Sequence, residues 1–120
     1  MTNTIRTQVG ILGAGPAGLL LAHLLGKAGI DSVVIDARSR EDIEGTVKAG
    51  IVESPAAEVL AESGVSDRIY REGMKHDGVE FHFDGRAHRF DFQELVGKSV
   101  YLYPQHEVLK DLIAARIRDG

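Results

Sequence analysis

The sequence predicts an α/β fold in which helices join the strands of a parallel sheet, and two neighbouring patterns support this. A short apolar strand from Thr7 leads into the glycine-rich turn 13–18 and then into a leucine-rich helix that closes at Gly29. The β-branched run 32–36 follows at once, and such a run is typical of a parallel strand buried on both faces. Strand, turn, helix and strand therefore form one βαβ unit in the first 36 residues.

Composition and charge exclude several classes of function. With 43% hydrophobic and 27% charged residues among 120, the chain has the balance of a soluble globular domain. Its net charge of −4, with Lys and Arg scattered, argues against nucleic acid as a partner. Met1–Val9 lacks the features of a secretory signal, and no apolar run approaches the roughly 20 residues of a membrane span. We expect a cytoplasmic protein without a membrane partner.

The segment after the βαβ unit is expected to lie at the surface. Residues 37–50 are polar and charged, which predicts an excursion with a helical turn and no core residues. Residues 55–62 contain good helix formers with a proline near the start and a glycine beyond the end, and a second short helix is expected at 66–71.

A β-hairpin is predicted outside the parallel sheet. Its strands, 79–83 and 86–90, flank the dipeptide Asp84-Gly85, which favours a tight type I′ turn. The apolar residues of the first strand share one face, so we expect a half-buried hairpin. His82 and His88 are expected at exposed positions, and the five histidines show no metal-ligand spacing, so no metal site is predicted.

The C-terminal part combines a strand at 100–103 with a helix at 105–118. Tyr101 and Tyr103 alternate with apolar residues, which favours a packing role for both. No strand remains to receive a helix that crosses back over the sheet, so we expect the N-terminal piece of a longer protein. The helix residues expected to face the core are Val108, Leu109, Leu112, Ile113 and Ile117.

The glycine turn matches a dinucleotide-binding pattern. Gly13-x-Gly15-x-x-Gly18 follows a strand and opens a helix, and Asp36 lies 18 residues beyond the third glycine. The glycines allow a tight turn, close approach of a pyrophosphate, and close packing of helix on strand, while the acid can bind a ribose diol. Asp36 would also repel a 2′-phosphate, which disfavours NADP at this site. A tight turn in some other α/β protein is a less favoured reading of the same glycines.

The βαβ unit alone does not distinguish NAD from FAD, because both contain an ADP moiety. A simple dehydrogenase domain would continue with alternating strands and helices. Here a polar excursion, helices and a hairpin precede the strand at 100–103, as expected in a larger flavoprotein domain. An NAD-dependent dehydrogenase and a non-catalytic module that binds an ADP-containing dinucleotide remain as alternatives.

Several segments in the same order resemble the class A flavoprotein aromatic hydroxylases, the family of 4-hydroxybenzoate 3-monooxygenase. These segments are the residues 13–22, 27–31, 48–53, 77–80 and 103–107. The resemblance implies that residues 1–120 are the N-terminal part of a Rossmann-like FAD-binding domain in a larger two-domain flavoprotein. It also implies the hydroxylation of a phenolic aromatic acid with FAD, NADPH or NADH, and O₂. The expected reaction converts 4-hydroxybenzoate to 3,4-dihydroxybenzoate. The small aromatic substrate and the catalytic groups would be bound by parts of the protein beyond residue 120, and a homodimer of the full-length protein is compatible with it.

The resemblance also implies which residues of this chain contact the cofactor. Thr46 and Lys48 stand where well-studied members of the family have arginines, and lysine keeps the charge without the bidentate fork. Glu41 and Asp42 opposite Arg38 and Arg40 leave NADH and NADPH both open, with NADH or dual use favoured. The cofactor-binding residues expected in this way are Gly13, Gly15, Pro16, Ala17, Gly18, Asp36, Ala37, Arg38, Thr46, Val47, Lys48 and Gln105.

Overall fold

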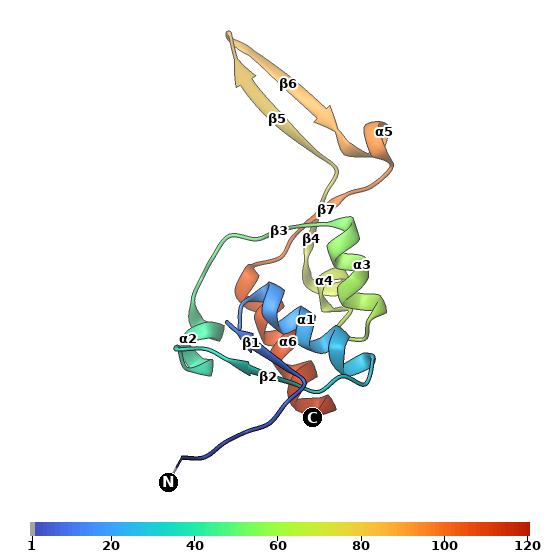
Figure 1. The fold of residues 1–120 in the computed structure, drawn as a ribbon. Coiled ribbons are helices and arrows are strands. Elements are labelled where there is room, and N and C mark those ends of the chain that lie inside the picture. Colours follow the sequence, from blue (N-terminus) through green and yellow to red (C-terminus); the bar gives the residue numbers. More distant parts are fainter. Residues whose placement is uncertain (1) are drawn as a thin grey trace.

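The computed structural model describes residues 2–120, and Figure 1 shows a helical and sheet-containing body from which one hairpin projects. Among these residues no helix is both long enough and apolar enough to cross a bilayer. The elements in chain order are β1 (Val9–Leu12), α1 (Pro16–Lys27), β2 (Ser32–Ile35), α2 (Arg40–Gly45), β3 (Ile51–Glu53), α3 (Ser54–Glu62), α4 (Arg68–Glu72), β4 (Met74–His76), β5 (Gly78–Phe83), β6 (Arg86–Asp91), α5 (Phe92–Val96), β7 (Val100–Leu102) and α6 (Gln105–Asp119).

The predicted βαβ unit is confirmed. β1 pairs with β2 in parallel, and α1 connects them, with a proline in its first turn and Gly29 just past its end at φ +75°. The expected burial of the run 32–36 on both faces is wrong for the described residues. Ile35 in β2 is 56% exposed, and Leu12 in the neighbouring β1 is 84% exposed, because the helices within residues 2–120 cover the other face of the sheet.

The core lies where α6 packs along α1, near α2. Val108, Leu109 and Leu112 are buried as predicted, but Ile117 is 62% exposed and its predicted core position is wrong. Five residues after Leu112 a helical side chain has turned about 140° away, so Ile117 faces the open groove over β2 instead. The core cluster comprises Ala14, Leu19, Ile43, Ala57, Leu60, Val65, Ile69, Tyr103, Val108, Leu109, Leu112 and Ala115.

The surface excursion contributes to the core, contrary to the prediction. Ser39 caps α2 by accepting a hydrogen bond from the Asp42 N–H at 3.1 Å, and this short helix turns Ile43 inward. Ile43 is only 4% exposed and packs in the core cluster. One apolar side chain among charged neighbours gave too weak a periodicity for this burial to be predicted.

A second, antiparallel sheet joins the middle of the chain to its end. β7 is the predicted strand, shortened by one residue, and it pairs with β3 on one side and β4 on the other. β3 and β4 were not predicted, because each has three residues and is too short to show alternation. Tyr103, directly after β7, is 3% exposed, which confirms its packing role.

The hairpin forms as predicted but is not half-buried. Asp84 and Gly85 both have positive φ, at 52° and 68°, as a type I′ turn requires. β5 and β6 project from the body (Figure 1), and Phe81 and Phe83 are 52% and 55% exposed, because no second layer packs on them within residues 2–120. The His82 side chain is exposed as expected, whereas the ring of His88 stacks on that of Phe83, with the centroids 3.9 Å apart.

Candidate functional site: a dinucleotide-binding turn

The turn between β1 and α1 depends on two glycines with different tasks. Gly13 has a φ of +109°, which disfavours other residues, and its N–H donates to the Ile35 carbonyl at 2.7 Å, so the turn is tied to the end of β2. A Cβ on Gly18 would lie 2.1 Å from the Gly13 carbonyl oxygen. This contact is with backbone and cannot give way, so residue 18 must be glycine for α1 to lie this close to the turn.

The second glycine of the motif, Gly15, leaves space that the protein does not fill. A Cβ on Gly15 would meet nothing within 4 Å, and Gly15 caps α1 without a side-chain hydrogen bond. The first turn of α1 has no acidic side chain, and its N–H groups have no acceptors within the helix. Free N–H groups and the positive end of the helix dipole suit a diphosphate here.

Asp36 lies beside this turn as a fixed carboxylate. Its Oδ2 accepts the Ala14 N–H at 2.9 Å, and its Oδ1 accepts the Arg38 N–H at 2.8 Å. The Arg38 guanidinium donates to both oxygens, at 3.0 and 3.1 Å. These bonds, first the Arg38 side chain and then the Ala14 N–H, hold the pKa of Asp36 well below its ordinary range. The carboxylate can therefore accept ribose hydroxyls, provided that Arg38 releases part of it.

Two adjoining hollows bring most of the predicted residues together. The smaller, of about 100 Å³, lies between the start of α1, the segment after α2 and the start of α6, and it is lined by Gly15, Pro16, Arg38, Ile43, Thr46, Lys48, Gln105 and Leu109. The larger, of about 400 Å³, is open beside the glycine turn and is lined by Leu12, Gly13, Ile35, Asp36 and Ala37. Six predicted residues share the first hollow and three share the second.

The remaining predicted residues lie differently. Gly18 packs against the Gly13 backbone, and Ala17 is exposed on the first turn of α1. Val47 is 80% exposed and lines neither hollow. Thr46 donates its hydroxyl to the Asp42 carbonyl at 2.6 Å, so its side chain also closes the end of α2.

Gly50 belongs to the site although the sequence analysis missed it. The N–H of Tyr103 donates to the Gly50 carbonyl at 3.1 Å, and that of Gln105 donates to the Lys48 carbonyl at 3.4 Å. A Cβ on Gly50 would lie 2.2 Å from the Tyr103 carbonyl oxygen, so the two segments need glycine in order to touch. The signal was a glycine directly before the apolar residues of β3, which can mark a close approach of backbones.

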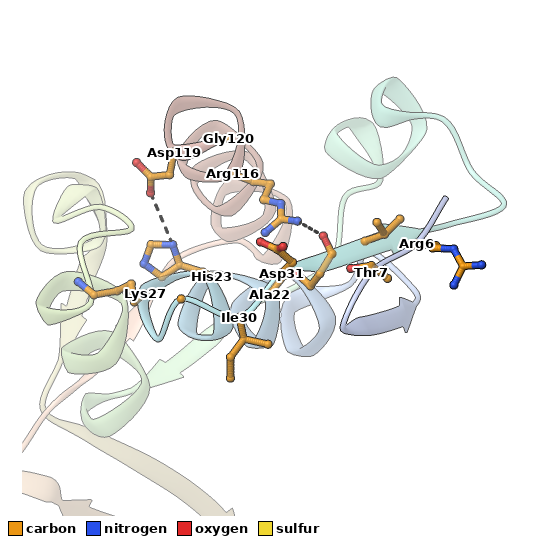
Figure 2. A pocket seen from close by; sticks show the side chains of 14 residues that line it. Arg6, Thr7, Ala22, His23, Lys27, Ile30, Asp31, Arg116, Asp119 and Gly120 are labelled. Carbon is orange, nitrogen blue, oxygen red and sulfur yellow. Dashed lines mark hydrogen bonds and ion pairs between the residues drawn. The ribbon is translucent and has the colours of Figure 1, made fainter. Parts of the chain in front are cut away.

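The largest hollow, of about 570 Å³, lies at the opposite end of α1 (Figure 2). There His23 lies 2.7 Å from the Ser63 carbonyl and faces Asp119, while Arg116 donates to the Ser32 carbonyl at 2.5 Å. The carbonyl end of a helix dipole is negative, so this hollow is poorly suited to a diphosphate. Within residues 2–120 no group of three metal-ligating side chains occurs.

Comparison with known proteins identifies the family of this chain. A family profile described as an FAD binding domain matches residues 6–120. A p-hydroxybenzoate hydroxylase from Acinetobacter baylyi is 42% identical over 118 residues, covering 98% of this chain and 29% of the hydroxylase. A phenol 2-monooxygenase from a Pseudomonas species is 32% identical over 63% of this chain and 12% of its own length. The chain thus spans less than a third of these relatives.

Solved structures agree at the level of the fold. The crystal structure of PqsL from Pseudomonas aeruginosa has a TM-score of 0.83 at 22% identity over 94% of this chain and 31% of that one. The p-nitrophenol 4-monooxygenase PnpA from Pseudomonas putida has a TM-score of 0.74 at 24% identity over 98% of this chain and 29% of its own. The predicted Rossmann-like fold is therefore confirmed. Because the family profile matches residues 6–120, nearly the whole sequence, this chain belongs to the FAD binding domain family.

Proposed function

We propose that the complete protein is an FAD-dependent monooxygenase that uses NADH or NADPH and O₂ to hydroxylate a phenolic aromatic acid. The substrate proposed is 4-hydroxybenzoate and the product 3,4-dihydroxybenzoate. The observation that supports this most strongly is the 42% identity, over 98% of the chain, to a p-hydroxybenzoate hydroxylase. We also propose that the protein acts in the cytoplasm, and a homodimer is compatible with this function.

The residues near the glycine turn fit FAD in size and charge. The diphosphate would lie against Gly13, Gly15 and the first turn of α1, where no side chain intrudes. Asp36 would bind the adenosine ribose, Lys48 would approach a phosphate, and Gln105 would contact the ribityl chain. When bound, FAD supplies the redox chemistry by which NAD(P)H and O₂ insert one oxygen atom into the ring.

This chain's own contribution is to bind and orient the cofactor. Asp36 remains ionised because Arg38 and the Ala14 N–H stabilise its charge, so it needs no proton transfer on binding. Gly15 leaves the N–H groups at the start of α1 accessible. These N–H groups would hold the diphosphate without help from a flexible side chain. The groups that bind the substrate are expected outside residues 1–120, so no catalytic residue is assigned here.

Two arginines bear on the choice of reductant. Arg38 is engaged with Asp36, and Arg40 pairs with Glu44 at 3.0 Å within α2. The 2′-phosphate of NADPH would need a free cation at this surface, and the carboxylates of Glu41 and Asp42 nearby would repel it. These pairings support NADH, or the use of both nucleotides, over a strict requirement for NADPH.

The test uses the complete purified protein. We expect a yellow protein with the visible spectrum of bound flavin, whose oxidation of NADH or NADPH accelerates on addition of 4-hydroxybenzoate, with 3,4-dihydroxybenzoate as product by mass spectrometry. Phenol and 4-nitrophenol serve as comparison substrates. A colourless protein that reduces NAD with another substrate would support a dehydrogenase instead, and nucleotide binding without turnover would support a non-catalytic module.

A further inference from the structure

A cluster of charged side chains gathers around the buried carboxylate of Asp111, behind the turn that bears Gln105. Asp111 is 9% exposed, and its carboxylate accepts hydrogen bonds from Arg68 Nη1 at 2.8 Å and from the Tyr103 hydroxyl at 2.5 Å. Arg68 Nη2 pairs with Glu107 and Nε with Glu72, and the guanidinium lies 5.5 Å from the centroid of the Tyr103 ring. The cluster therefore joins α4, the end of β7 and α6.

These contacts keep the Tyr103 hydroxyl protonated and its side chain in one position. Burial and the bond to Asp111 raise the pKa of the Tyr103 hydroxyl far above its ordinary value, so it stays a donor. Burial likewise raises the pKa of Asp111, and Arg68 opposes this by stabilising the charged form. Arg68 is ion-paired with Glu72, Glu107 and Asp111, so several carboxylates hold its guanidinium beside Asp111.

The backbone of Tyr103 connects this cluster to the cofactor site. Its N–H bonds to Gly50, and the Gln105 N–H bonds to Lys48, so the same turn positions both cofactor candidates. The contact at Gly50 is too close for the turn to slide, since even a Cβ there would clash with the Tyr103 carbonyl. Tyr103 is thus fixed through its ring on one side and through its backbone on the other.

We propose that Tyr103 is a positioning residue for the flavin side of the FAD site, held in place by Asp111 and Arg68. The inference rests on the proposed function, because it requires FAD as the ligand. A buried ion pair often stabilises a fold no more than apolar side chains of the same volume, and its directional bonds select a single geometry. Here that geometry sets where Gln105 and Lys48 meet the cofactor.

The test replaces the Tyr103 hydroxyl while keeping the ring. In the complete flavoprotein, Tyr103→Phe is expected to raise the dissociation constant of FAD about three- to tenfold, because one bond to a charged group is lost and the turn relaxes. The visible circular dichroism of the bound flavin should change as well. Tyr101→Phe is the matched control, since its hydroxyl has no hydrogen-bond partner in residues 2–120 and the ring packs on Tyr70. It should leave both readouts unchanged.

Asp111→Ala gives a second, independent readout, because it removes the acceptor of the Tyr103 hydroxyl. If the hydroxyl acts through Asp111, adding Tyr103→Phe to Asp111→Ala should weaken FAD binding by less than about twofold, since coupled residues are not additive. If the fold losses of FAD affinity in the two single variants simply multiply in the double variant, the inference is overturned. The folded fraction of every variant is measured by far-ultraviolet circular dichroism.

The outcomes separate the inference from the proposed function. A wild-type protein that binds no FAD overturns both. A wild-type protein that binds FAD, together with a Tyr103→Phe variant that matches Tyr101→Phe in affinity and in visible circular dichroism, overturns the positioning role alone. A loss of affinity no larger than the loss of folded fraction overturns it too, because the effect would then be one of stability only.

Discussion

The βαβ unit and the β5–β6 hairpin are both local structures that short sequence signals predict, yet their apolar side chains have different environments. In α1, Leu19 is 6% exposed and Ala22 is fully buried, because α6 packs along them. In the hairpin, Phe81 and Phe83 are more than half exposed, and the ring of Phe81 contacts mainly Phe90 across the strands. The backbone of both regions can be predicted from the sequence, but the packing of their apolar side chains differs.

The difference shows that periodicity specifies which face is apolar but not what covers it. α6 covers α1 from more than 75 residues further along the chain, and no local pattern contains that contact. The hairpin has an equally clear apolar face, but within residues 2–120 only the short helix α5 contacts β5 and β6, and Phe81 and Phe83 stay more than half exposed (Figure 1). Four predictions test this contrast and the site that depends on it.

The largest expected effect is in the core under α6. Leu112→Ala should lower the free energy of unfolding of the 120-residue chain by about 2–5 kcal/mol, because Leu112 is 1% exposed and its removal leaves a cavity. Phe81→Ala should cost less than about 1 kcal/mol, since an exposed side chain loses little burial. Urea unfolding monitored by circular dichroism measures both. Equal losses of unfolding free energy in the two variants would show that side chains of the hairpin and of the body are packed alike.

The next effect separates two glycines of the same turn. Gly18→Ala should lower the free energy of unfolding by about 1–3 kcal/mol, because its Cβ would collide with the Gly13 carbonyl. The Cβ of Gly15→Ala would meet open space in the protein. In the complete protein, Gly15→Ala should instead weaken FAD binding, since its methyl would enter the space proposed for the diphosphate. Unfolding curves and FAD titrations measure the two effects.

Gly26 provides the matched control within α1. A Cβ there also meets nothing within 4 Å, but Gly26 lies at the far end of the helix. Gly26→Ala should stabilise the fold by about 0.5–1 kcal/mol through helix propensity and leave FAD affinity unchanged. Loss of FAD in both alanine variants would show that the space at Gly15 has no special role.

Much of the site could be predicted from the sequence because it depends on local chemistry. The glycine turn and Asp36 come from a fixed spacing within one βαβ unit, where each residue type has a defined backbone or hydrogen-bonding task. The burial of Ile43 and the close approach at Gly50 could not be predicted, because each depends on a partner far away in the chain. The partly covered Arg68 and the buried Asp111 likewise look like surface charges when α4 and α6 are considered separately.

A smaller effect is expected at the cap of α2. Ser39→Ala removes the acceptor for the Asp42 N–H, which should cost about 1 kcal/mol and loosen the segment that leads to Lys48. Ser39→Asp restores an acceptor and is the control, expected to keep wild-type stability. Thermal unfolding measures the change, and an alanine variant as stable as the aspartate variant would show that the cap does not hold α2.

The smallest effect is a pH dependence at Asp36, whose side chain is 12% exposed but pairs with the 44% exposed side chain of Arg38, so that solvent screens the pair. Because the folded pKa lies below its ordinary value, the ionised carboxylate stabilises the fold above about pH 4, and this stabilisation is lost as the pH falls. The difference in Tm between wild type and Asp36→Asn should therefore be constant near neutrality and shrink towards about pH 2. Arg38→Gln removes the largest cause of the shift and should flatten this dependence. A profile that Arg38→Gln leaves unchanged would mean that the guanidinium does not hold the carboxylate in solution, and Arg38 would then be free to meet a nucleotide phosphate.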